Sequence, residues 1–171
     1  MHARARALAV LVVALFVFGA TAATAKAPAT GKFKASGGVA FTFTIHKGKC
    51  VPPPKNLNNP MAGHGPARKG LCFNSGDDPP VNITCPQGAS ISGETALVSS
   101  FSRLRLSKSG SMHLRAYAYT SAPDPVGFTE LSIKVSGSKA TGFVRETDQV
   151  FVNDQPVECD TGKLKFTARK S

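Results

Sequence analysis

Residues 130–146, ELSIKVSGSKATGFVRE, are the stretch that best indicates how this chain folds. Leu131, Ile133 and Val135 alternate with polar residues, the period-two pattern of a strand with one buried face. Gly137 supplies a turn, and a second run returns from residue 140. The stretch therefore predicts an antiparallel hairpin.

Similar alternation extends outward in both directions. Residues 39–45, VAFTFTI, place Val39, Phe41, Phe43 and Ile45 on one face. A second hairpin is expected from 101–106 and 112–119, turning at Lys108-Ser109-Gly110. Strands that recur at this spacing, with turn residues between them, predict an all-β chain, an antiparallel β-sandwich or, as the alternative, a small β-barrel. Shorter runs cover 81–85, 149–153 and 163–168.

The N-terminus has the pattern of a cleaved signal helix. Arg4 and Arg6 precede an apolar run from Leu8 to Phe18, and Ala23-Thr24-Ala25 fits a signal-peptidase site. The run is too short for a retained membrane helix, which needs roughly 20 residues. We therefore expect a signal peptide over 1–25, cleavage after Ala25, and a secreted or envelope-associated protein with no transmembrane segment in the mature chain.

The rest of the chain is predicted to form one domain. Residues 26–38 are small and polar, and are expected to be a flexible leader or a weak first strand at 32–34. Residues 39–171 form the predicted β-sandwich, interrupted by a loop at 50–72 that is rich in proline and glycine. Such a loop either presents a binding element or is a tolerated insertion.

Cysteine usage supports export. The four cysteines are Cys50, Cys72, Cys85 and Cys159, and an even count in an exported protein predicts two disulfides. Three pairings are possible. No two cysteines have the close spacing of a zinc site, so zinc is not expected.

Positive charge is concentrated near the start of the mature chain. Without Arg4 and Arg6, the chain holds 19 basic and 10 acidic residues, a net charge of +9. All the acids lie at Asp77 or later, so residues 26–76 carry +8. Such a block favours an anionic partner, here an anionic cell-envelope polymer, although it equally suits solubility. No nucleic-acid-binding motif is present, so nucleic acid is not an expected partner, and we expect a monomer.

One strand face is a candidate binding face. His113, Arg115, Tyr117 and Tyr119 alternate along 112–119, and such a face can hold sugars by stacking or anions by charge. An ordinary solvated face has the same composition. Further cations fall on the predicted hairpin that contains this strand, namely Arg103, Arg105 and Lys108.

Metal binding is not predicted. Met61, His64 and His46 are of the types that copper accepts, but no second close histidine and no carboxylate accompany them. Residues 74–78, NSGDD, lack the spacing of a calcium loop and are typical of a turn. No metal and no cofactor are therefore expected.

Catalytic signals are also weak. No Gly-x-Ser-x-Gly elbow occurs, and no cysteine is expected to be free. Two of Glu94, Glu130 and Glu146 across a cleft, or His113 beside an acid, would suit a small secreted hydrolase of glycosidase type. No catalytic residue is assigned. The leading hypothesis is a secreted non-catalytic binding or structural module, and the hydrolase is the alternative.

The C-terminal part resembles a known group. A strand ending in Cys85 is followed by the segments at 101–117 and 130–147, and then by Cys-x-x-Gly-x-x-x-aromatic-Thr-Ala. This pattern is similar to that of uncharacterised exported β-sandwich proteins of actinobacteria, over about residues 81–171. The residues of the final motif are Cys159, Gly162, Phe166, Thr167 and Ala168.

The resemblance implies a fold and a disulfide pairing but no activity. Members with two cysteines keep the equivalents of Cys85 and Cys159, which leaves Cys50 to pair with Cys72. The N-terminal part departs from the group's pattern, where the 50–72 loop looks like an addition.

Overall fold

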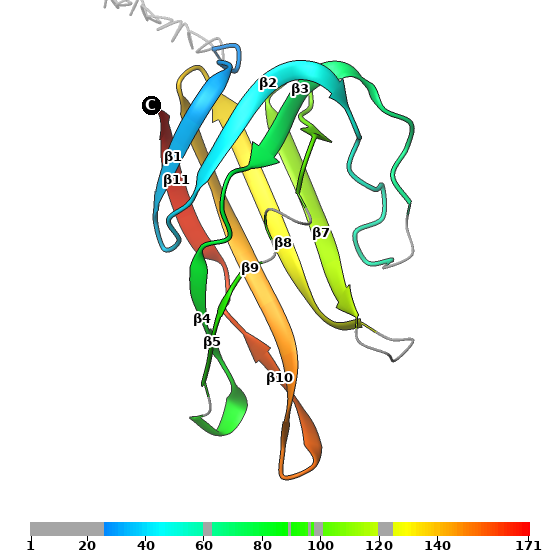
Figure 1. Cartoon of the computed structure of the whole chain (residues 1–171), viewed down its shortest axis with the longest axis vertical. Coiled ribbons are helices and arrows are strands. Elements are labelled where there is room, and N and C mark those ends of the chain that lie inside the picture. Colours follow the sequence, from blue (N-terminus) through cyan, green and yellow to red (C-terminus); the bar gives the residue numbers. More distant parts are fainter. Residues whose placement is uncertain (1–25, 60–62, 89, 96, 98–100, 120–124) are drawn as a thin grey trace, which may run out of the picture.

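The computed structural model describes residues 26–171 except 60–62, 89, 96, 98–100 and 120–124 (Figure 1). The signal peptide expected over 1–25 lies outside the described residues. Antiparallel strands dominate, as the alternation predicts, with one 3₁₀ turn at Pro86–Gly88. The strands are β1 (Gly31–Gly37), β2 (Thr42–Cys50), β3 (Arg68–Ser75), β4 (Pro80–Thr84), β5 (Ser90–Glu94), β6 (Leu104–Arg105), β7 (Ser111–Tyr119), β8 (Pro125–Ser136), β9 (Lys139–Val152), β10 (Gln155–Asp160) and β11 (Leu164–Lys170).

These strands form one continuous open sheet in the order β5-β4-β10-β9-β11-β1-β2-β3-β6. Strand β9 is the branch point, because β8 pairs along one of its edges while β11 and β10 share the other. Strand β7 extends the branch beyond β8. The sheet does not close on itself, so the fold is a sandwich and not a closed barrel.

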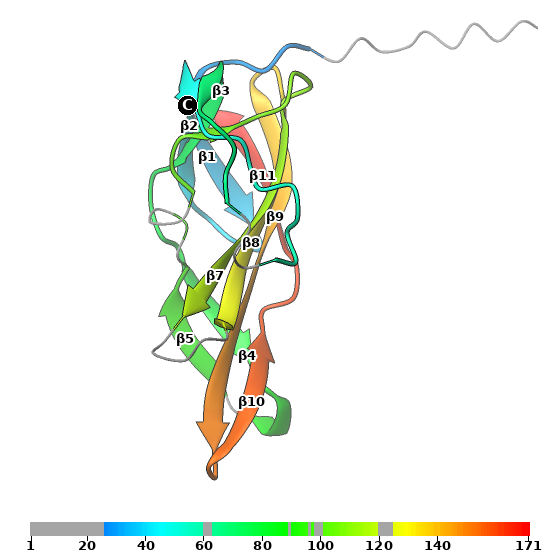
Figure 2. The same ribbon diagram turned by 90° about the vertical axis from the view of Figure 1, so that its right-hand side faces the viewer.

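The sheet rolls so that two of its walls share one core. Phe43 and Phe73, on β2 and β3, belong to the same buried cluster as Leu131 and Val144, on β8 and β9. Figure 2 shows β1 to β3 on one side of the molecule and β8 and β9 on the other. Aromatic rings fill the first wall, where Phe33 stacks on Phe43 with ring centroids 5.0 Å apart.

The N-terminal leader needs a correction. Residues 31–37 form β1, which pairs with β2 on one edge and β11 on the other. The expectation of a flexible leader over 26–38 is therefore wrong for this part, and the alternative of a first strand at 32–34 is right. The reason is that Phe33 and Ala35 are buried in the core, with 0% and 1% exposed.

The two predicted hairpins have different outcomes. Strands β8 and β9 pair as expected, with Ser136 opposite Lys139 across a tight turn. The second hairpin is wrong, although Gly110 does take a positive φ of 78° in its turn. Strand β6 pairs with β3, and β7 pairs with β8, so the turn carries the chain between two walls of the sheet. Residues that favour a turn can reverse the chain direction, but they do not determine which neighbouring strand each flanking strand pairs with.

Both disulfides have the expected pairing. Cys50 joins Cys72, and Cys85 joins Cys159. Two disulfides are typical of an oxidising, extracellular environment. Within the described residues, no helix has the length and apolar character needed to cross a membrane.

Strands β9 and β10 project from the sandwich as a hairpin arm, residues 146–160, at the lower end of Figure 1. Its turn is Asn153-Asp154, with both residues at positive φ. Phe151 is 71% exposed near the tip. The arm holds five acidic residues and no lysine or arginine: Glu146, Asp148, Asp154, Glu158 and Asp160.

Candidate functional site

A large hollow lies where β2, β3 and β6 meet, at the end of the molecule opposite the hairpin arm. Its volume is about 720 Å³. Leu71 and Leu106 give it an apolar component, and Gly48 and Gly70 also line it. We call it the basic hollow, because half of its lining residues are cationic: Lys47, Lys49, Lys69, Arg105 and Lys108.

A curl in the β2–β3 ladder shapes this end of the molecule. Cys50 pairs with Arg68, and His46 pairs with Cys72. Four residues of straight strand would separate Cys50 from Cys72 by about 13 Å, yet their Cα atoms are 5.3 Å apart. The ladder must therefore bend back on itself, as Figure 1 shows at the top of the molecule, and the disulfide fixes the bend.

Two facing glycines permit the curl. Gly48 and Gly70 are direct partners in the ladder. A Cβ on Gly48 would lie 3.4 Å from the sulfur of Cys72, and a Cβ on Gly70 would lie 3.0 Å from Nε of Arg105. The second distance is too short for an ordinary side chain without a shift of Arg105. The glycine pair thus lets Arg105 pack closely beside the bend.

No carboxylate of the described residues lines the basic hollow. Among the described residues, the ion pairs join His113 and Arg115 to Glu130, and Arg145 to Asp160. None involves a cation of the basic hollow. Lys47, Lys49, Lys69 and Lys108 are also exposed to solvent. This cluster of positive charge has no internal counterion within the part of the chain that the structure describes.

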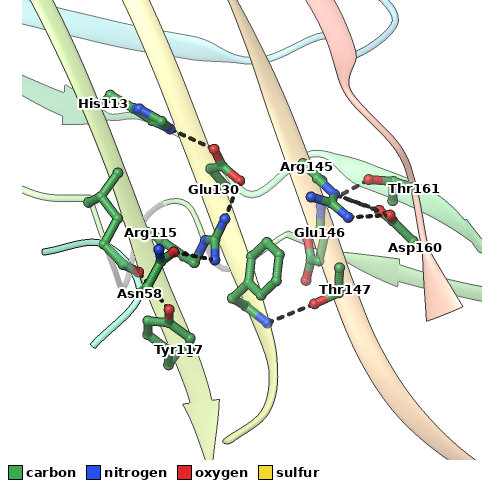
Figure 3. A network of polar contacts seen from close by, with 12 residues as sticks. Asn58, His113, Arg115, Tyr117, Glu130, Arg145, Glu146, Thr147, Asp160 and Thr161 are labelled. Atoms are coloured by element: carbon green, nitrogen blue, oxygen red, sulfur yellow. Dashed lines mark hydrogen bonds and ion pairs between the residues drawn. The ribbon is translucent and has the colours of Figure 1, made fainter. Parts of the chain in front are cut away.

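The predicted face on β7 has different surroundings. Nε2 of His113 lies 2.6 Å from Oε1 of Glu130, and a terminal nitrogen of Arg115 donates to Oε2 of the same carboxylate at 3.0 Å (Figure 3). Glu130 is only 4% exposed. Burial raises the pKa of Glu130, but the hydrogen bonds and charges of His113 and Arg115 outweigh it, so its pKa lies below the usual value. Glu130 therefore stays ionised and ties two of the four face residues together.

The loop between the first two cysteines covers part of this face. Residues 68–72 belong to β3, so the segment between β2 and β3 is 51–67, of which 60–62 lie outside the described residues. The hydroxyl of Tyr117 donates to the carbonyl of Leu57 at 2.6 Å, and Arg115 donates to the side chain of Asn58 at 3.4 Å. The loop is therefore held against β7 as well as by the disulfide.

The four face residues do not share one cavity. Arg115, Tyr117 and Tyr119 line a narrow hollow of about 180 Å³ beside the loop, whereas His113 lines other hollows. Tyr119 is 44% exposed. A ligand-binding role for the four residues stays a prediction.

The same polar surface continues across β8 and β9. The guanidinium groups of Arg115 and Arg145 lie 4.0 Å and 5.4 Å from the ring centroid of Phe128. Arg145 also makes a bidentate pair with Asp160, with its shortest contact at 2.6 Å. The hydrogen bonds from Arg145 hold the pKa of Asp160 below its usual value. Both arginines thus stabilise the fold through neighbours on adjacent strands.

The three candidate carboxylates are not arranged as a glycosidase pair. Glu130 lies opposite Arg145 in the β8–β9 ladder, so Glu146, the next residue, points to the other face of the sheet. Glu94 is exposed at the end of β5. The hollows at the β6 end and beside β7 contain none of the three glutamates. His113 beside Glu130 is the part of the hydrolase hypothesis that the geometry does bring together.

Glu146 has a strongly raised pKa. Burial, and then the negative charges of Asp148 and Asp78, raise its pKa to about 7. Its Oε2 atom is buried and makes no hydrogen bond. A carboxyl in this position is partly protonated at neutral pH, which avoids an unpaired buried charge.

Metal binding finds no geometric support among the described residues, which contain no group of three or more histidine, cysteine or acidic residues placed to hold a metal ion. His64 lies 3.0 Å from the carbonyl of Pro52 through Nδ1. Met61 lies outside the described residues. In the 74–78 segment, Asn74 and Ser75 belong to β3, and Asp77 just beyond the strand accepts a hydrogen bond from the backbone of Thr42 at 2.6 Å.

Comparisons with models of protein families, with curated proteins and with solved structures return no match to this chain. Sequence reasoning located the basic block but grouped Arg105 and Lys108 with Arg115 on one hairpin. The structure separates them, since Arg115 faces Glu130 while Arg105 and Lys108 line the basic hollow.

Proposed function

We propose that this protein is a non-catalytic binding module that holds anionic polymers of the cell envelope in the basic hollow. The observation that carries the proposal is the cluster of Lys47, Lys49, Lys69, Arg105 and Lys108, in a hollow whose described lining includes no carboxylate. Export to an envelope location is part of the proposal, and it is supported by the signal-like N-terminus and the two disulfides.

Electrostatics explains why this arrangement favours a ligand. Like charges gathered at one site repel each other and weaken the folded state slightly. An anion that enters the hollow relieves this repulsion and gains attraction from several side chains at once. The apolar components, Leu71 and Leu106, lower the local dielectric and strengthen that attraction.

The test is binding to anionic polymer across a salt series, using protein purified after expression of the full chain. A triple variant, Lys47→Glu, Lys69→Glu and Lys108→Glu, reverses charge in the basic hollow. Its matched control is Lys34→Glu, Lys139→Glu and Lys165→Glu, which makes the same change of net charge at exposed positions on β1, β9 and β11.

We expect the protein to sediment with polyphosphate-coated beads and with anionic wall material at low salt and to be released as salt rises. The hollow variant should lose binding, and the control should keep most of it. Equal loss of binding in both variants would mean that net charge, and not the basic hollow, determines binding. Absence of binding by the unmodified protein at low salt would refute the proposal.

The hydrolase alternative depends on the contact between His113 and Glu130. An exposed histidine oriented by a buried carboxylate is a geometry that general bases use. Its test is glycosidase activity that disappears in His113→Gln, whereas the binding proposal expects that variant to retain anion binding.

A further inference from the structure

Two further hollows adjoin the basic hollow. Strands β6 and β7 are joined by one turn yet pair with different neighbours, which leaves a seam between them. A second hollow, of about 380 Å³, shares Arg105, Leu106, Ser107 and Lys108 with the basic hollow. Pro52 and Pro53 form part of its wall. The seam is thus lined by β6, the following turn and the start of the 51–67 loop.

A third hollow extends the path over β7. It has a volume of about 410 Å³ and shares Ser111, Met112 and His113 with the second hollow. Lys134 of β8 lines it, and the Nζ of Lys134 donates to the hydroxyl of Ser111 at 3.3 Å. Each hollow shares lining residues with the next, so the three are neighbours in a series from Lys69 to Lys134, which we call the path.

The path carries positive charge, and no carboxylate from the described part of the chain lines it. Its first part holds the five cations of the basic hollow, and its far part holds Lys134, with the imidazole of His113 between them. Glu130 contacts His113 but lines none of the three hollows, so its charge lies behind the imidazole. A compact anion would fill only the basic hollow, whereas an extended anion could contact the whole path.

We propose that the ligand is an unbranched polymer with repeated anionic groups, and that it lies along the seam from the basic hollow to Lys134. This inference rests on the proposed function and adds the shape of the ligand to it. The rigid wall formed by Pro52 and Pro53 and the succession of small hollows suit a single chain better than a branched one.

The test compares short and long anions of one chemistry. The probes are tripolyphosphate and long-chain polyphosphate, measured by calorimetry across a salt series. The variants are Lys134→Ala at the far end of the path, Lys69→Ala in the basic hollow, and Lys139→Ala as an exposed control at the start of β9. Long-chain polyglutamate is a third probe, and it tests whether the site prefers carboxylate groups or phosphate groups.

We expect Lys134→Ala to weaken binding of the long chain about fivefold and to leave tripolyphosphate unchanged. It should also lower the slope of log affinity against log salt for the long chain by about 0.7. Lys69→Ala should weaken both probes, and Lys139→Ala should weaken neither.

Binding that is independent of chain length and of Lys134 would refute the proposal that the polymer lies along the seam. It would leave the proposed binding in the basic hollow unaffected. Absence of binding by every probe at low salt would overturn the proposed function as well. Preference for polyglutamate over polyphosphate would keep the path and identify the anionic group as carboxylate.

Discussion

The cations of β7 and β9 and the cations of the basic hollow have opposite surroundings. Arg115 and Arg145 each face a carboxylate on a neighbouring strand and lie against the ring of Phe128. Lys69 and its neighbours in the basic hollow face one another. The difference shows that carboxylates within reach on neighbouring strands decide whether a surface cation is committed to the fold or remains available to a ligand.

The distribution of acids along the sequence explains much of this contrast. Every acidic residue lies at Asp77 or later, so a cation on β2 or β3 has an acid only through a long-range contact. Strand β8 supplies Glu130 to β7 by direct pairing. Strand β6, the outer neighbour of β3, supplies Leu104 and Arg105 instead.

Removing each disulfide should give the largest losses of unfolding free energy. Comparing the two variants also separates effects on stability from effects on polymer binding. The double variant Cys85→Ala, Cys159→Ala opens a span of 74 residues and should cost about 4 kcal/mol of unfolding free energy. The variant Cys50→Ala, Cys72→Ala opens a span of 22 residues and should cost about 3 kcal/mol. Urea unfolding measures both changes.

Polymer binding by the two disulfide variants sharpens the comparison. Only the Cys50–Cys72 bond fixes the curl, so only its loss should weaken binding at a temperature where both variants are folded. Weaker binding by the Cys85–Cys159 variant alone would mean that the curl does not shape the site.

The next largest effect is expected from Glu130→Ala. It leaves Arg115, whose side chain is 20% exposed, without its counterion, and should cost about 3 kcal/mol of unfolding free energy. Lys69→Ala is the control from the other region and should change stability by less than about 0.5 kcal/mol. The measurement is urea unfolding. Equal losses of unfolding free energy in the two variants would contradict the distinction between charges that stabilise the fold and charges that remain available to a ligand.

Glu146→Gln should give a smaller effect that depends on pH. In the folded protein the pKa of Glu146 is about 7, against 4.5 in a model peptide, so the folded state binds the proton more tightly. Stability of the unmodified protein should therefore fall as pH rises from about 4.5 to about 7, and stay level above that range. Glutamine removes this loss.

The variant Glu146→Gln should match the unmodified protein below pH 4.5 and exceed it by about 1–2 kcal/mol above pH 7, after allowance for solvent screening. Thermal unfolding across a pH series measures the difference. A difference that does not change between pH 4.5 and pH 8 would contradict the assigned protonation of this carboxyl.

Local pattern predicted most of the strands. The alternation in 130–146 gives the β8–β9 hairpin, and the residues expected to face inward on β8, Leu131, Ile133 and Val135, are buried. The buried phenylalanines of 39–45 were predicted in the same way. Such patterns report which side of a strand is buried, and they do so reliably where one face packs on a core.

Pairing partners were less predictable. Nothing in the turn after Leu106 indicates that β6 joins β3, because that choice depends on contacts far away in sequence. The link between Arg115 and Glu130 depends on the register of β7 against β8. The basic hollow depends on a bend at Gly48 and Gly70, two glycines that carry no distinct signal of their own. Long-range geometry therefore decided the candidate site.

The hairpin arm gives the molecule a polarity that extends beyond any single contact. Its acids lie at one end of the long axis, and the cations of the basic hollow lie towards the other (Figure 1). This separation creates an electric dipole moment along the molecule, and a negatively charged surface exerts a torque on such a dipole. The protein should therefore approach an anionic surface already oriented, with the curled end first and Phe151 facing away from the surface.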